Sequence, residues 1–129
     1  MVQKEPNRPY IDTELLDELA SIYKHDHDLD SLIAKFIVAT HLNISKLNQA
    51  LTEADKPCYI QVFHALKGSS GIVGATQVYD ICVLVEHHQH LGTDMMQQYL
   101  DQLKIVFCNT EGALTDYLQK RLLHREQHG

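Results

Sequence analysis

The chain has 129 residues, of which 44% are hydrophobic and 22% charged, a composition typical of one globular domain with one core. Its formal net charge of −6 argues against a nucleic-acid partner, because binding along a phosphate backbone normally needs a clustered basic face. Three cysteines without a CxxC pair predict no disulfide framework, and no signal peptide or membrane span is predicted. We therefore expect a cytoplasmic chain without direct membrane contact.

The first two helices are predicted from caps and apolar periodicity. Residues 1–10 are polar and form a loose N-terminal segment in this prediction. Asp12 caps a short first helix. The charged stretch 24–30 reads as a turn, and either Asp30 or Ser31 caps the second helix, whose apolar residues recur at helical spacing.

Three further helices follow after short breaks. Pro57 suits the first turn of the third helix, where a missing N–H costs nothing, and Gly74 is a plausible stop. Thr76 is predicted to cap the fourth helix, and Thr93 the last and longest one.

No segment alternates apolar and polar residues with a period of two, so no strand is predicted. Amphipathic helices with short connections favour an all-α fold, an antiparallel four-helix bundle with a short additional N-terminal helix. The expected domain spans residues 11–124, with 125–129 as a C-terminal tail.

One histidine of the third helix is predicted to face solvent. The buried face of this helix is defined by Phe63, Leu66, Ser70 and Val73. At about 100° per residue, His64 points about 160° away from the centre of that face. Lys67 supplies a positive charge one turn on, while Gly68 and Gly71 are small residues whose helix propensity is poor. Small residues beside an exposed imidazole leave space for a large partner.

The residues around this histidine also carry a family resemblance. Residues 64–75 read HALKGSSGIVGA, which resembles the signature of histidine phosphotransfer (HPt) domains: His-x-Leu-Lys-Gly, two small residues, and a hydrophobic-Gly-Ala ending. Ser69 and Ser70 replace in part the commoner small apolar pair, a mild departure. The likeness continues more loosely over residues 11–122.

The resemblance implies roles for individual residues. It makes His64 the phosphoacceptor and gives Lys67 the task of holding the phosphoryl group. Gly68 leaves room for the partner, Gln61 lies on the docking face, and Glu86 matches a position that often carries a polar residue near the phosphohistidine.

Docking is also expected to use the small and apolar neighbours of the histidine. Ile60 and Ile72 can provide a dry contact surface, and Gly71 repeats the open space of Gly68.

The chemistry expected of this chain is that of a carrier and not of an enzyme. No glycine-rich nucleotide loop is present, so we expect no ATP site and no cofactor of the chain's own. Phosphoryl transfer needs a metal, which the resemblance assigns to the partner. The implied partners are response-regulator receiver domains, which bind Mg²⁺, and a hybrid sensor histidine kinase. Residues 10–19 resemble the start of HPt domains at the C-terminus of such kinases, and the sequence leaves open whether this chain is one.

Two alternatives have to be weighed. A dimetal bundle would need Glu-x-x-His pairs, but Glu86 is followed by Gln89 at that spacing, so no metal site is predicted and the histidines at 87–90 are read as a solvated helix end. The second alternative is an HPt-fold interaction module that binds and restrains a non-receiver partner, such as a quorum-signal synthase.

Overall fold

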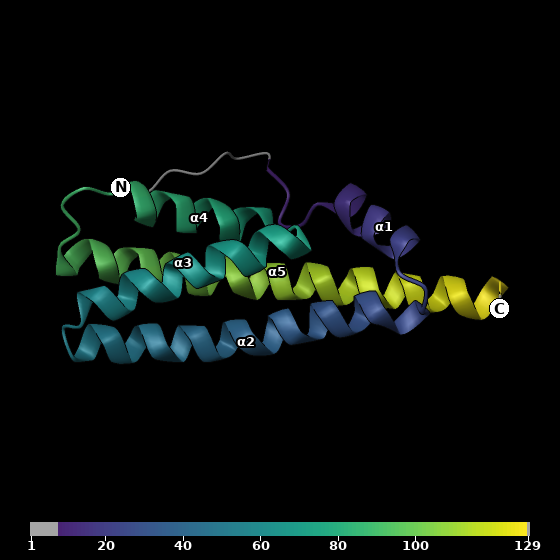
Figure 1. Cartoon of the computed structure of the whole chain (residues 1–129), viewed down its shortest axis with the longest axis horizontal. Coiled ribbons are helices and arrows are strands. Elements are labelled where there is room, and N and C mark those ends of the chain that lie inside the picture. Colours follow the sequence, from purple (N-terminus) through teal and green to yellow (C-terminus); the bar gives the residue numbers. More distant parts are fainter. Residues whose placement is uncertain (1–7, 129) are drawn as a thin grey trace.

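The computed structural model describes residues 8–128, within which there are five helices and no strand. The helices are α1 (Thr13–Ile22), α2 (Asp26–Thr52), α3 (Lys56–Val73), α4 (Thr76–His87) and α5 (Thr93–His128). From α3 to α5, each helix runs antiparallel to the one before it in the chain (Figure 1). Helix α1 lies at the opposite end of the bundle from α4. The predicted all-α bundle with an additional N-terminal helix is confirmed.

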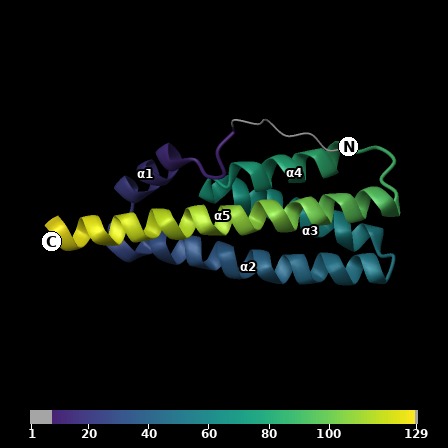
Figure 2. The same ribbon diagram turned by 180° about the vertical axis from the view of Figure 1, so that it is seen from behind.

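The helices differ strongly in length, and this shapes the bundle. Helices α2 and α5 have 27 and 36 residues and are about 40 and 54 Å long, whereas α3 and α4 have only 18 and 12 residues. Four helices therefore surround the core at one end only. Figure 2 shows that α4 lies over the N-terminal half of α5 and α1 over its C-terminal half.

Several predicted helix ends are confirmed. The Asp12 carboxylate accepts a hydrogen bond from the backbone N–H of Leu15 at 3.1 Å, as an N-cap does. Pro57 lies in the first turn of α3. Gly74 ends α3 with a left-handed φ of 69°, which strongly favours glycine, and a Cβ there would lie 3.2 Å from Asp12 Cβ.

The predicted start of α2 is wrong. The helix begins at Asp26, not at Asp30 or Ser31, so residues 26–30 are helical and not a turn. No side-chain cap marks this start. Tertiary contacts stabilise the added turn, because Leu29 is buried in the core and Asp30 binds two arginines of α5.

Thr76 does not cap α4 as predicted. Ala75 occupies the N-cap position and Thr76 is the first helical residue. The Thr76 hydroxyl instead donates a hydrogen bond to the carbonyl of Pro9.

Thr93 does not cap α5 either: it is the first helical residue, and the Met96 N–H donates a hydrogen bond to the carbonyl of the preceding Gly92. Helix α5 continues through residues 125–128, where a C-terminal tail was expected.

The core is continuous from one end of the bundle to the other. Its fully buried large side chains include Leu16, Leu29, Ile33, Leu47, Tyr59, Phe63, Leu66, Val73, Ile81, Leu100, Leu103 and Leu114. Every helix contributes to this set. The buried Tyr59 hydroxyl donates to the carbonyl of Met96 at 2.8 Å, which ties α3 to the start of α5.

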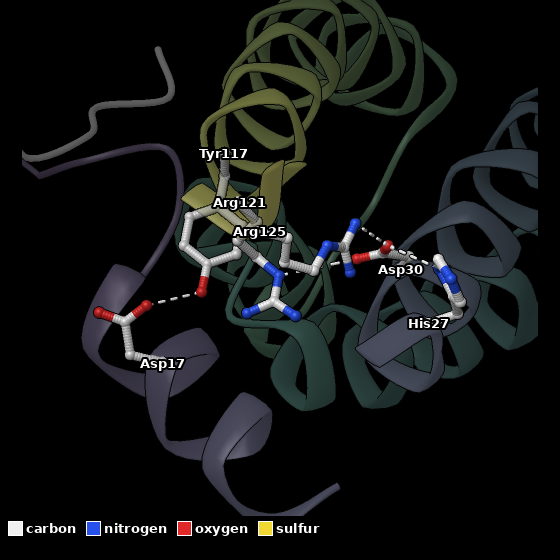
Figure 3. Close-up of polar contacts among 6 residues, drawn as sticks. All are labelled: Asp17, His27, Asp30, Tyr117, Arg121 and Arg125. Carbon is white, nitrogen blue, oxygen red and sulfur yellow. Dashed lines mark hydrogen bonds and ion pairs between the residues drawn. The ribbon is translucent and has the colours of Figure 1, made fainter. Parts of the chain in front are cut away.

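A polar network joins α1, α2 and α5 at the end of the bundle away from α4 (Figure 3). The Asp30 carboxylate lies 3.0 Å from Arg125 Nη2 and 3.6 Å from Arg121 Nε, with His27 Nδ1 also at 3.6 Å. The Tyr117 hydroxyl donates to Asp17 at 2.6 Å. Burial and this hydrogen bond raise the pKa of Tyr117 to about 12, so the hydroxyl keeps its proton.

The described part of the N-terminal segment makes polar contacts with the bundle. Residues 1–7 of the predicted loose segment lie outside the described residues. Arg8 Nε lies 2.7 Å from the Asp80 carboxylate on α4, and the Tyr10 hydroxyl accepts a hydrogen bond from Asn109 on α5 at 3.1 Å. Residues 8–10 are therefore held against α4 and α5.

Candidate functional site

Helix α3 presents His64 to solvent, as the spacing predicted. Six residues of α3 are buried: Tyr59, Val62, Phe63, Leu66, Ser70 and Val73. They occupy one side of the helix, and His64 lies on the other, exposed side. Buried residues occur along α3 from Tyr59 to Val73, so packing against the core holds the backbone that carries the imidazole in place. The imidazole ring itself remains accessible.

Lys67 follows His64 by one turn and forms an ion pair with α4. Its Nζ lies 2.6 Å from Glu86 Oε2, and the two side chains are 27% and 39% exposed. The hydrogen bond with Lys67 lowers the pKa of Glu86, and the same bond raises the pKa of Lys67. Both groups are therefore charged at neutral pH, and the structure brings together two residues that are 19 positions apart in the sequence.

The two glycines near His64 have different surroundings. A Cβ added to Gly68 would meet no atom within 4 Å, so packing against other parts of the chain does not demand this glycine. A Cβ added to Gly71 would lie 3.6 Å from two ring carbons of Tyr79, an ordinary van der Waals contact. Gly68 thus opens a clear approach one turn from the imidazole, while Gly71 lies beside an α4 aromatic ring.

Apolar and polar residues flank His64 on the exposed side of α3. Ile60 is 42% exposed one turn before it, and Ile72 is 60% exposed two turns after it. Gln61 is also exposed. Exposed apolar side chains also occur elsewhere, such as Ile105 at 64%, so what distinguishes these two isoleucines is their place on either side of His64.

Tyr79 and His87 also belong to this surface, although the sequence assigned no role to Tyr79 and predicted His87 only as part of a solvated helix end. Tyr79 packs beside Gly71, and His87, the last residue of α4, adds to the electrostatic effects that lower the pKa of Glu86. Tyr79 and Glu86 are seven residues apart, which places them on the same face of α4. The sequence spacing could have placed these two residues on one face of α4. Only the packing of α4 on α3 shows that this face lies beside His64.

The histidine-rich end of α4 differs in part from its prediction as a solvated end. His88 is half-buried, and its Nδ1 lies 3.0 Å from the Tyr99 hydroxyl on α5. Among the side chains that the structure describes, no three of His, Cys, Asp or Glu lie together in a way that could hold a metal ion. The described helices also include none with the length and apolar character that a membrane span requires.

Comparison with known proteins assigns the chain to a family. Residues 31–121 match the family model described as Hpt domain. Among solved structures, the fold is similar to that of histidine-containing phosphotransfer protein B (HptB) from Pseudomonas aeruginosa PAO1, with a TM-score of 0.73 and 18% sequence identity over 87% of this chain and 96% of that one. No curated protein sequence matches the chain. The chain therefore belongs to the Hpt domain family, whose members are phosphoryl carriers that pass phosphoryl groups through a histidine in phosphorelays and are not catalytic enzymes.

Proposed function

We propose that His64 accepts a phosphoryl group from the phosphoaspartate of one receiver domain and passes it to the aspartate of another. The observation that carries this proposal is the arrangement on α3. An exposed imidazole is followed one turn on by a lysine and by a glycine beside open space.

The chemistry needs only a nucleophile from this chain. The lone pair of the unprotonated ring nitrogen forms an N–P bond while the P–O bond of the aspartyl phosphate breaks, and the aspartate carboxylate leaves. Onward transfer reverses these changes on a second aspartate. Mg²⁺ and the in-line geometry are supplied by the receiver, because the chain's contribution near His64 is a single lysine cation and not a carboxylate pair.

Lys67 is proposed to stabilise the phosphorylated state. An ammonium group acts as a compact point charge for a phosphoryl oxygen, and Lys67 follows His64 on the same side of α3. Its ion pair with Glu86 on α4 restricts where the ammonium can lie.

Docking is proposed to use the exposed surface around His64. Ile60 and Ile72 would exclude water from the contact, Gln61 would hydrogen-bond at its edge, and Gly68 and Gly71 would let the receiver's loops reach the imidazole. The partners proposed are receiver domains of response regulators and of a hybrid sensor histidine kinase. Because all three cysteines are free, a reducing location such as the cytoplasm suits the chain.

The test is transfer from a phosphorylated receiver domain to the full chain in the presence of Mg²⁺. We expect the label to move to the chain and to be acid-labile, as phosphohistidine is. A chain that binds a non-receiver protein but takes no label from several receivers would support the interaction module instead.

A further inference from the structure

The Glu86 carboxylate contacts Lys67, the lysine that is proposed to hold the phosphoryl group. A carboxylate 2.6 Å from the Lys67 ammonium stabilises the lysine before the phosphoryl group arrives. His64 and His87 contribute to the lowered pKa of Glu86, so this carboxylate lies within electrostatic reach of the acceptor ring. Glu86 therefore lies where it can influence both the lysine and the acceptor ring.

Phosphorylation changes the balance of charge around this ion pair. A phosphoryl group on His64 adds close to two negative charges near neutral pH. The Lys67 ammonium has three hydrogen-bond donors, so it can bridge the carboxylate and the phosphoryl group or turn from one to the other. In either arrangement the two anions compete for one cation and repel each other.

We propose that Glu86 is a positioning residue that acts through Lys67: it holds the ammonium on α4 and competes with the phosphoryl group for it, which keeps the phosphohistidine from becoming too stable to pass on. This inference rests on the proposed role of His64. It gives α4 a part in setting how readily the carrier gives up its phosphoryl group.

The test measures how long the phosphohistidine persists. The full chain is phosphorylated with phosphoramidate, a small donor whose P–N bond breaks as the imidazole N–P bond forms and ammonia leaves. The decay of the phosphohistidine ³¹P resonance by hydrolysis is then followed at neutral pH in the wild type and in Glu86→Gln. Because Glu86 competes with the phosphoryl group for Lys67, we expect the half-life of the phosphohistidine to be about 1.4- to 5-fold longer in Glu86→Gln, the size expected for the loss of one exposed ion pair.

Two further variants separate this role from a general charge effect. Glu18→Gln removes an exposed carboxylate of α1, outside the site, and should leave the half-life unchanged. In a Lys67→Met background, Glu86→Gln should lengthen the half-life by a much smaller factor, because the residue acts through the lysine. An undiminished effect in that background would overturn the proposal, and so would an unchanged half-life in Glu86→Gln alone.

Failure of this inference can be told apart from failure of the proposed function. If phosphoramidate labels some residue other than His64, the assignment of the acceptor is wrong. If His64 is labelled and the phosphohistidine of Glu86→Gln decays at the wild-type rate, only the role of Glu86 is wrong.

Discussion

The space beside Gly68 allows folding and docking to be separated in one substitution. A side chain at this position meets no atom within 4 Å at its Cβ, so Gly68→Gln should fold normally. Replacing a glycine inside a helix by a better helix former should stabilise the bundle by about 0.5–1 kcal/mol, which corresponds to a rise in Tm of about 2–4 °C. The glutamine side chain would nevertheless extend into the approach to His64.

Transfer should therefore fall although stability rises. A displacement of about 1 Å from the reactive geometry can reduce a rate by roughly 100-fold, and a glutamine side chain is longer than that. The assay pairs thermal denaturation with the rate of receiver-to-chain transfer on the same protein. Gly112→Gln is the matched control, because Gly112 lies inside α5, is exposed and also has open space at its Cβ.

The control should gain similar stability and transfer at the wild-type rate. A stable Gly68→Gln protein that transfers as fast as the wild type would refute the access argument. A Gly68→Gln protein that unfolds while Gly112→Gln does not would show instead that packing demands the glycine.

Three other outcomes are expected. Purified chain incubated with ATP and Mg²⁺ alone should incorporate no phosphate above background, and measurable labelling would reveal a nucleotide site that the sequence does not show. Asp30→Asn should lower the free energy of unfolding by about 1–2 kcal/mol, because Arg121 and Arg125 lose their shared carboxylate, while transfer to His64 stays unchanged. An undiminished Tm in thermal denaturation would show that the network does not stabilise the fold. Iodoacetamide should modify the exposed Cys108 much faster than Cys82, whose pKa is raised to about 12 by burial, and equal rates followed by mass spectrometry would contradict the burial of Cys82.

The sequence predicted well what depends on local chemistry. A capping aspartate at Asp12, a proline in a first turn and a glycine that stops α3 act within a few residues of their own position. The outward placement of His64 also follows from the apolar stripe of one helix, since a helix of fixed pitch determines which side chains face away from the core.

What the sequence could not predict depends on contacts between distant segments. The start of α2 reads as a charged turn, and only the burial of Leu29 and the arginines of α5 around Asp30 explain why it is helical. The Lys67–Glu86 ion pair joins two helices, so its existence depends on how α4 packs on α3. The same holds for Thr76, whose hydroxyl binds a carbonyl far away in the sequence.

The central claim is that His64 is the phosphoacceptor, and the most direct measurement is to locate the phosphate. The full chain is phosphorylated by a receiver domain in Mg²⁺, and the modified residue is identified by mass spectrometry under conditions that preserve phosphohistidine. The account predicts label on His64 alone, its complete loss in His64→Gln and its retention in His41→Gln, a control at an exposed histidine of α2 outside the site. Label that persists at the wild-type level in His64→Gln would contradict it.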